Sequence, residues 1–224
     1  WERPLYIAIS VGEVSKLKFN DYFVQEGLAF RFTPFNYRVW GDAEGDNGYA
    51  VDIEKLYDNV MNRYKYGGLD TPGLYLDETT LRTCYYHRRL FAQLAKELIK
   101  QGDHVRARKV LTYAEQAVPA YNVPEIYESG SFDIATAYAA LGEKTKAVTL
   151  FNHLIAESED YINWAFSLGN GRTGMMQNDC LYKFWQWNAY NERMKEIDKE
   201  SYEASNRRFE EKYALFTQII NNRN

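Results

Sequence analysis

The sequence is poor in the residues that usually build metal and nucleophile sites. Its three histidines have no second ligand at metal spacing, and its two cysteines form neither a CxxC motif nor a zinc-binding pattern. No Gly-x-Ser-x-Gly motif is present. We therefore expect no metal, no cofactor and no catalytic residue in this chain. The sequence leaves open whether Cys84 and Cys180 are two buried thiols or one disulfide.

Long apolar runs and clusters of one charge are also absent. The longest apolar segment, Leu5–Val11, is far shorter than the roughly 20 residues that a membrane-spanning helix requires. No signal peptide opens the chain, and it starts at Trp1 without an initiator methionine, so we expect a piece of a longer protein. The net charge is −4 and the basic residues are scattered, which argues against a nucleic-acid partner.

Aromatic residues, in contrast, are abundant. They make up 16% of the chain, with 19 tyrosines, 12 phenylalanines and 5 tryptophans, within a composition that is 46% hydrophobic and 26% charged. This composition is typical of a folded globular protein. Because tyrosine buries its ring and keeps its hydroxyl near water or a partner, the pattern favours broad half-buried surfaces, such as stacked helices provide.

The N-terminal segment, residues 1–76, differs from the rest of the chain. Leu5–Val11 is apolar and β-branched and predicts a buried strand, and Leu28–Phe35 predicts a second strand. Asp52 is a suitable N-cap for a helix beginning at the next residue, and Gly67 and its neighbouring glycine end that helix. This segment is therefore expected to be a small α/β unit.

Residues 77–224 predict helices in pairs. Asp77 can cap a long helix that reaches about residue 101, and a turn and a second helix follow. The same order returns later in the chain: Gly102 and Gly142 lie 40 residues apart in the two turns, and so do Ala107 and Ala147 in the helices after them. Agreement of two markers indicates a repeat. The small and bulky positions resemble the tetratricopeptide pattern, with an inserted loop at residues 121–129.

A third helix pair is expected over residues 179–199 and 202–221, with helix-spaced aromatic residues in both members. The predicted fold is therefore mainly α: a tetratricopeptide-like array of α-hairpins that follows a small N-terminal α/β segment. Such arrays form concave surfaces that bind extended peptides.

Two glycine-rich motifs suggest ligand sites at first sight and fail on inspection. In Asp42–Gly48, Asn47 and Ile53 occupy the positions where a calcium loop needs glycine and glutamate, so a plain turn is expected. Gly169–Gly174 matches G-x-G-x-x-G but follows helical repeats, whereas a dinucleotide site needs a preceding strand. We expect a loop between helix pairs there.

Two groups of residues are candidates for binding. In the predicted register, the concave surface is lined by Arg89, Lys96, Phe132 and Thr136. The other candidate is an aromatic shelf for sugars or apolar peptide side chains, made by Trp164, Trp185 and Trp187. The alternative for the tryptophans is the core of the third helix pair.

Four stretches carry a family resemblance: Trp1–Tyr6, Gln25–Arg31, Leu56–Met61 and Gly73–Glu78. With the helix pairs after them, they resemble the C-terminal soluble region of bacterial multi-spanning membrane proteins related to protein O-mannosyltransferases. The resemblance implies a membrane-attached parent, with this domain on the periplasmic, non-cytoplasmic side. In such transferases the catalytic residues belong to the membrane part, so none is carried over to this chain.

Three functions are compatible with these observations. The first is an accessory domain of the transferase-like parent that binds a peptide, a protein partner or an acceptor. The second is a domain that braces the membrane part and binds nothing. The third is an independent glycan-processing enzyme, which would need two carboxylates facing each other across a cleft.

Overall fold

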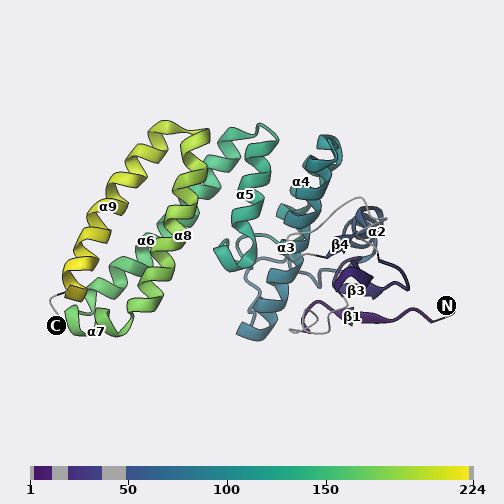
Figure 1. The fold of residues 1–224 in the computed structure, drawn as a ribbon, viewed down its shortest axis with the longest axis horizontal. Coiled ribbons are helices and arrows are strands. Elements are labelled where there is room, and N and C mark those ends of the chain that lie inside the picture. Colours follow the sequence, from purple (N-terminus) through teal and green to yellow (C-terminus); the bar gives the residue numbers. More distant parts are fainter. Residues whose placement is uncertain (1–2, 12–19, 37–48, 222–224) are drawn as a thin grey trace. The chain divides into compact units, whose positions relative to one another are not determined.

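The computed structural model describes residues 3–11, 20–36 and 49–221 (Figure 1). The chain forms two compact units, residues 1–124 and 125–224. The predicted division after residue 76 falls inside the first unit and stays a prediction. The predicted turn at Asp42–Gly48 lies outside the described residues.

The described part of the N-terminal segment forms a small mixed sheet. Its four strands are β1 (Tyr6–Ala8), β2 (Phe23–Gln25), β3 (Ala29–Phe32) and β4 (Ala50–Val51), in the order β1-β3-β2-β4. β3 pairs antiparallel with β1 and β2, and β2 pairs parallel with β4. A short 3-10 helix, Asn20–Tyr22, precedes β2. The core of the sheet is formed by Phe23, Phe30 and Tyr49.

The predicted strand within Leu5–Val11 exists, but the prediction that it is buried was wrong. Among the strands that the structure describes, β1 pairs with β3 alone and is an edge strand, and Leu5 and Tyr6 are 54% and 47% exposed. An apolar run that is short cannot distinguish a central strand from an edge strand, because burial depends on which strands pair beside it. The sequence did not predict β2 or β4, which have only three and two residues.

The helix after the sheet starts where the sequence indicates. The Asp52 side chain accepts a hydrogen bond from the Lys55 amide, and α2 (Ile53–Asp58) follows. The helix then widens into a π-helical turn, η3 (Asn59–Arg63). α3 (Glu78–Lys100) begins at the second predicted cap, Asp77, whose carboxylate accepts hydrogen bonds from two backbone amides.

Two α-hairpins have equivalent turns. α3 and α4 (His104–Ala117) form the first, and α5 (Ser131–Ala140) and α6 (Lys144–Ser167) form the second. Gly102 and Gly142 have φ of 79° and 77°. The amide after each glycine donates to the carbonyl five residues before it, at 2.9 Å in both turns. Ala107 and Ala147 are both fully buried. The two turns, 40 residues apart, therefore have the same backbone geometry, while the tetratricopeptide-like repeat stays a prediction.

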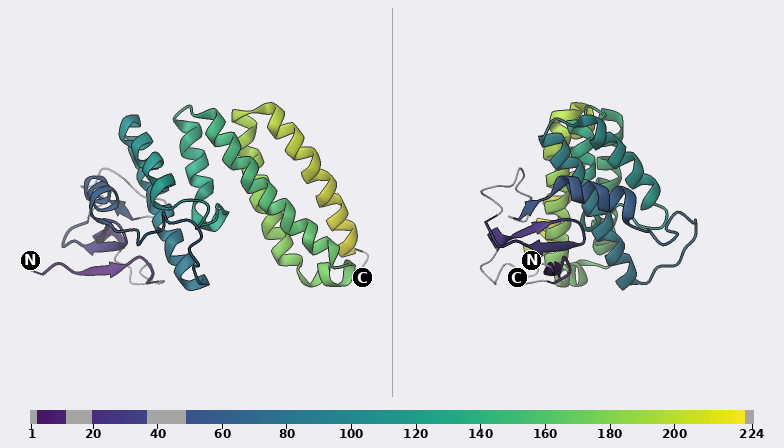
Figure 2. Two further views of the ribbon diagram at one scale, coloured as in Figure 1. Left: turned by 180° about the vertical axis from the view of Figure 1, so that it is seen from behind. Right: turned by 90° about the vertical axis from the view of Figure 1, so that its right-hand side faces the viewer.

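The third helix pair is α8 (Gln177–Ile197) and α9 (Lys199–Asn221), close to its predicted bounds. Within the second unit α6 packs against α5 and α8, and α8 packs against α9 (Figures 1 and 2). The loop expected at Gly169–Gly174 is instead a short helix, α7 (Asn170–Met175). Thr173 is buried there and donates to the Ala165 carbonyl at 2.7 Å, which satisfies an open end of α6.

A buried arginine holds the connection after the first hairpin. Arg88 of α3 is 3% exposed, and its guanidinium donates to the carbonyls of Val118, Val123 and Pro124 at 2.5–2.9 Å. The connection between α4 and α5 then passes through a single 3-10 turn, η4 (Tyr127–Ser129). The described chain is mainly helical with a small N-terminal sheet, so the predicted fold class is confirmed. None of the described helices is both long and apolar enough to cross a membrane.

Candidate interaction groove

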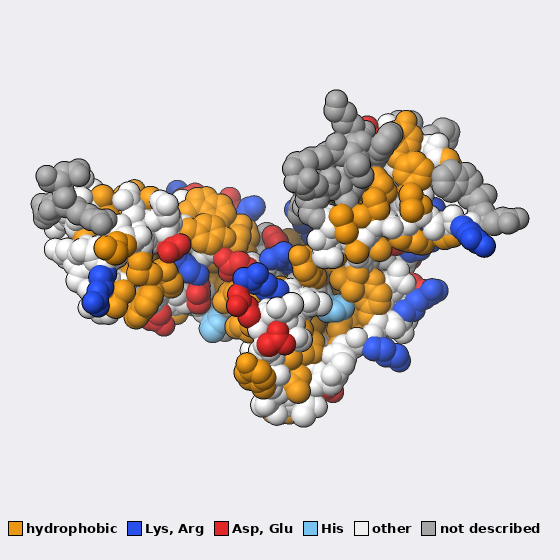
Figure 3. Space-filling model, turned by 90° about the horizontal axis from the view of Figure 1, so that it is seen from below, with side chains coloured by type: hydrophobic (Ala, Val, Ile, Leu, Met, Phe, Trp, Pro, Cys, Tyr) orange, Lys and Arg blue, Asp and Glu red, His pale blue; other side chains and the backbone are white. Residues whose placement is uncertain are grey.

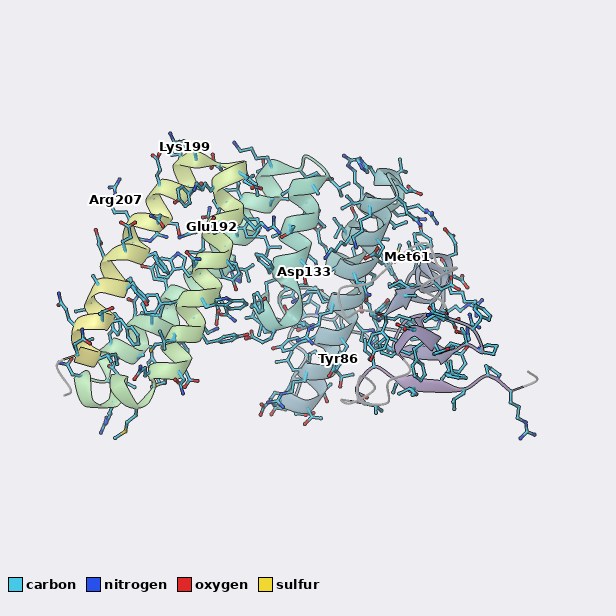
Figure 4. The ribbon with its side chains drawn as sticks, viewed as in Figure 1. Met61, Tyr86, Asp133, Glu192, Lys199 and Arg207 are labelled. Carbon is cyan, nitrogen blue, oxygen red and sulfur yellow. The ribbon has the colours of Figure 1, made fainter. Side chains whose placement is uncertain are left out.

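A groove lies between α5 and α8 in the second unit. Its volume is about 300 Å³. It is lined by Thr136, Ala139, Ala140, Phe151, Arg193, Glu196 and Ile197. Its floor is apolar because Phe151 of α6 is fully buried beneath the two small alanines of α5. Figure 4 labels Asp133 and Glu192, which lie on the two flanking helices.

The groove follows from residue spacing on the two helices. On α8, Trp185, Ala189, Arg193 and Glu196 recur at intervals of three or four residues, so they lie along one face. On α5 the alanines at its C-terminal end have no bulk to fill the space in front of that face. The same pair of helices therefore leaves an open channel where larger side chains would have closed it.

Aromatic rings gather at the other end of these helices. The ring of Tyr127 lies 5.3 Å from Trp185 in an edge-to-face arrangement, and Tyr182 stacks on Trp185 at 5.7 Å and 12°. Phe132 lies 5.7 Å from both Tyr127 and Tyr190. We call these five rings the aromatic end. Tyr182 and Trp185 are 43% and 51% exposed, so part of it is available to a partner.

Polar groups are buried beneath this aromatic end. Gln186 is fully buried and donates to Glu128 at 3.1 Å, while its side-chain oxygen has no hydrogen-bond partner among the described residues. Burial raises the pKa of the Tyr190 hydroxyl far above its ordinary value, and the charge of Glu157 adds to this. Tyr190 is fully buried, so its ring packs beneath the aromatic end and is not exposed to a partner.

Two charged side chains near the C-terminal ends of α5 and α8 have no ion-pair partner among the described residues. Arg193 and Glu196 both line the groove and are exposed, and neither forms an ion pair with any residue that the structure describes. A cation and an anion side by side offer both a donor and an acceptor for polar groups of a ligand.

The structure places the four predicted groove residues on two helices. Thr136 lines the groove, and Phe132 belongs to its aromatic end. Arg89 and Lys96 lie on α3 in the first unit; Arg89 is exposed, with its guanidinium 5.6 Å from the Tyr86 ring centre, and Lys96 is half-buried. Their role in binding stays a prediction.

The three predicted shelf tryptophans have different surroundings. Trp187 is fully buried and donates its indole N–H to Ser205 at 2.8 Å, so it has no face for a ligand. Trp164 is 50% exposed and packs on Tyr161, whereas Trp185 belongs to the aromatic end. Figure 3 shows hydrophobic side chains lying among charged ones on one face of the molecule.

Sequence reasoning missed most of the groove. Tyr127, Arg193 and Glu196 were not candidates, because their relevance depends on the packing of α5 against α8. The helical spacing from Trp185 to Glu196 was a usable signal. Among the residues that the structure describes, no three His, Cys, Asp or Glu side chains gather as metal ligands. Cys84 and Cys180 are separate free thiols, both buried.

A buried carboxylate ties the N-terminal sheet to the helix that follows it. Glu26 is 6% exposed and accepts from the Tyr6 hydroxyl at 3.1 Å, from Lys55 Nζ at 2.7 Å and from Arg31 Nε. Asn59 also donates to its backbone carbonyl at 2.6 Å. Burial raises the pKa of Glu26, but the hydrogen bonds from Lys55 and Arg31 outweigh that effect and lower the pKa below its ordinary value.

A protein-family model matches the N-terminal segment of this chain. Residues 1–54 match the family model TMEM260-associated domain 2. The match covers the described strands. It links the chain to TMEM260, a membrane protein that resembles O-mannosyltransferases, which are glycosyltransferases. No curated protein and no solved structure matches the chain. The matched segment ends inside α2, so the groove lies outside it.

Proposed function

We propose that this chain is a non-catalytic accessory domain of a membrane-bound glycosyltransferase-like protein, and that the groove between α5 and α8 binds an extended peptide of an acceptor or partner protein. The observation that carries the proposal is the groove itself, which Arg193 and Glu196 line without an ion pair to a described residue. The exposed stacked rings of Tyr182 and Trp185 lie nearer the N-terminal end of α8. The family match supports the link to the transferase.

The chemistry of the groove favours a peptide without strong net charge. Arg193 can donate to a peptide carbonyl and Glu196 can accept from a peptide amide, and their opposite charges give no preference for an anion or a cation. The rings of Tyr182 and Trp185 suit an apolar or proline side chain, because aromatic faces pack against extended proline-rich segments. An extended peptide could place its backbone groups against Arg193 and Glu196 and an apolar side chain against Tyr182 and Trp185.

On this proposal the helix pairs are tetratricopeptide-like units whose small residues create the partner surface. The parent is anchored in the membrane by a part outside this chain, and the domain lies on the periplasmic side. Arg89 and Lys96 of α3 would contribute further partner contacts.

A groove-filling variant tests the proposal. Ala140→Arg places a large side chain in the groove, and Ala214→Arg places the same side chain at an exposed position of α9 as a control. Peptides are selected from a displayed random-peptide library on the wild-type chain, and their affinities are then measured for both variants. We expect Ala140→Arg to weaken binding at least tenfold and Ala214→Arg to leave it unchanged.

Two results would contradict the proposal. Selected peptides that bind Ala140→Arg as tightly as the wild type would place the binding elsewhere. A library that yields no specific peptide would favour the alternative, a domain that only braces the transferase. In that case, deleting the domain from the full-length parent would reduce activity only in proportion to the amount of protein.

A further inference from the structure

A second cavity lies in the first unit, between the end of α2 and α4. Its volume is about 540 Å³, within the range of about 300–1,000 Å³ that is typical of small-molecule sites. It is lined by Met61, Asn62, Tyr64, Lys65, Tyr66, Gly67, Gly68, Asp70, Tyr113, Gln116 and Ala117. Met61, labelled in Figure 4, lies in the π-helical turn η3.

Three tyrosine rings line this cavity and are held in place. The Tyr66 hydroxyl donates to the Val60 carbonyl at 2.6 Å, and its ring lies 6.0 Å from Tyr113 at 77°. The Tyr64 hydroxyl accepts from the Leu28 amide at 2.9 Å. One face of Tyr66 also stacks on Phe91 at 5.6 Å. Because both hydroxyls are engaged in the protein, Tyr64 and Tyr66 can offer the cavity only the ring surface that remains uncovered.

Asn62 in the lining donates to the Asp58 side chain at 3.0 Å, but three other polar side chains of the lining have no such partner within the described part of the chain. The side chains of Lys65, Asp70 and Gln116 are exposed, and none of them has a hydrogen bond or ion pair with another described residue. Together they offer an ammonium donor, a carboxylate acceptor and an amide that can do both. Lys65 and Asp70 cancel in charge, so the lining does not select for an anion or a cation.

The loop that supplies part of this lining has a defined conformation. Gly67 and Gly68 have φ of 63° and 78°, which other residues rarely adopt. Asn122 donates to the carbonyls of Leu69 and Thr71, both at 2.7 Å, and Tyr121 donates to the Asp70 carbonyl at the same distance. The cavity is therefore formed before any ligand arrives, which reduces the entropic cost of binding.

We propose that this cavity binds a neutral saccharide. A sugar ring presents apolar C–H faces that pack on aromatic rings, and hydroxyls around its edge that both donate and accept hydrogen bonds. The cavity supplies both kinds of partner and no net charge. A phosphate would meet the Asp70 carboxylate, and an organic cation would meet Lys65, so a neutral polyhydroxylated ligand fits the lining best. The inference does not depend on the α5/α8 groove.

Binding of the purified chain to a panel of probes tests this proposal. The panel contains methyl mannoside, methyl glucoside, N-acetylglucosamine and a mannose disaccharide, with inorganic phosphate and choline as charged probes. Saturation-transfer NMR detects weak binding, and titration gives the dissociation constant. We expect at least one neutral sugar to bind at millimolar concentration or below, and neither charged probe to bind.

Variants locate the binding. Asp70→Ala removes one polar contact of the lining, and Gln116→Ala removes another; each is expected to weaken sugar binding about tenfold. Lys109→Ala, at an exposed position of α4 outside the cavity, is the matched control and should leave the affinity unchanged. Circular dichroism establishes that each variant is folded.

Three results would overturn the inference: no sugar in the panel binds, phosphate or choline binds in preference to the sugars, or sugar binding survives both cavity variants. Ala140→Arg should leave sugar binding unaffected, so the cavity and the groove are tested separately.

Discussion

The two compact units are stabilised in different ways. In the first, buried charged groups join short segments: Glu26 joins the sheet to α2, and Arg88 joins α3 to the connection after α4. In the second, long helices pack through aromatic rings, and a buried chain of hydrogen bonds runs from Trp187 through Ser205 to Asn191. Short strands cannot bury enough apolar surface alone, so directed hydrogen bonds fix them.

This difference extends to the sites. The first unit encloses a polar cavity between a glycine turn and a helix, which suits a small ligand. The second leaves a groove of about 300 Å³ between α5 and α8, for which we propose a peptide. In the first unit the cavity is formed by a loop with exposed polar groups. In the second unit the groove is formed where small residues of α5 face larger residues of α8. The predictions below test whether the units depend on different interactions.

The largest expected effect is in the first unit. Arg88→Met removes the donors for three backbone carbonyls, which would then be buried without partners. We expect a loss of about 3 kcal/mol or more in the free energy of unfolding, measured by urea denaturation. The neighbouring exposed variant Arg89→Met is the control, with an expected change within about 0.5 kcal/mol. Equal effects of the two variants would show that Arg88 is not a structural anchor.

The second prediction concerns pH. Because the pKa of Glu26 is lowered in the folded chain, its contribution to stability is fully present above the ordinary glutamate pKa. That contribution disappears as the pH falls through the folded value. We expect Glu26→Gln to cost about 2–3 kcal/mol at neutral pH and much less at an acidic pH below the folded pKa of Glu26.

Unfolding curves at the two pH values measure this difference. The control is Glu78→Gln, because Glu78 has a 79% exposed side chain that is paired with Arg82. A Glu26→Gln cost that does not change with pH would contradict the charged, hydrogen-bonded state of this carboxylate.

The third prediction concerns the buried polar chain of the second unit. Ser205→Ala leaves the Trp187 indole N–H and the side-chain oxygen Oδ1 of Asn191 without the hydroxyl that both now contact. We expect a cost of about 1–3 kcal/mol, read from urea unfolding followed by tryptophan fluorescence. Thr217→Ala, at an exposed position of the same helix, should cost little. A neutral Ser205→Ala would mean that packing alone holds α8 against α9.

The smallest expected loss of stability concerns the turns of the two hairpins, which can be compared directly. Gly102→Ala and Gly142→Ala each force a side chain into a left-handed conformation, and an added Cβ would have no atom within 4 Å in either turn. We expect the same cost, about 1 kcal/mol, for both, because only backbone strain contributes. Thermal unfolding of both variants measures it. Clearly unequal costs would show that the turns are not equivalent.

Local chemistry made several elements predictable. The caps at Asp52 and Asp77 follow from side chains that accept backbone amides, and the hairpin turns follow from glycines that adopt positive φ. The end of α6 was not predictable, and the helix continues to Ser167. No glycine or proline marks its end before Gly169, so the pattern gave no boundary.

The sequence by itself determined the helix pairs, their caps and the repeat of their turns, because these depend on neighbours within a few residues. Only the tertiary structure decided that β1 is an edge, that Trp187 is buried while Trp185 is exposed, and that α5 and α8 leave a groove between them. These features depend on which elements meet across long stretches of chain. No local spacing contains that information.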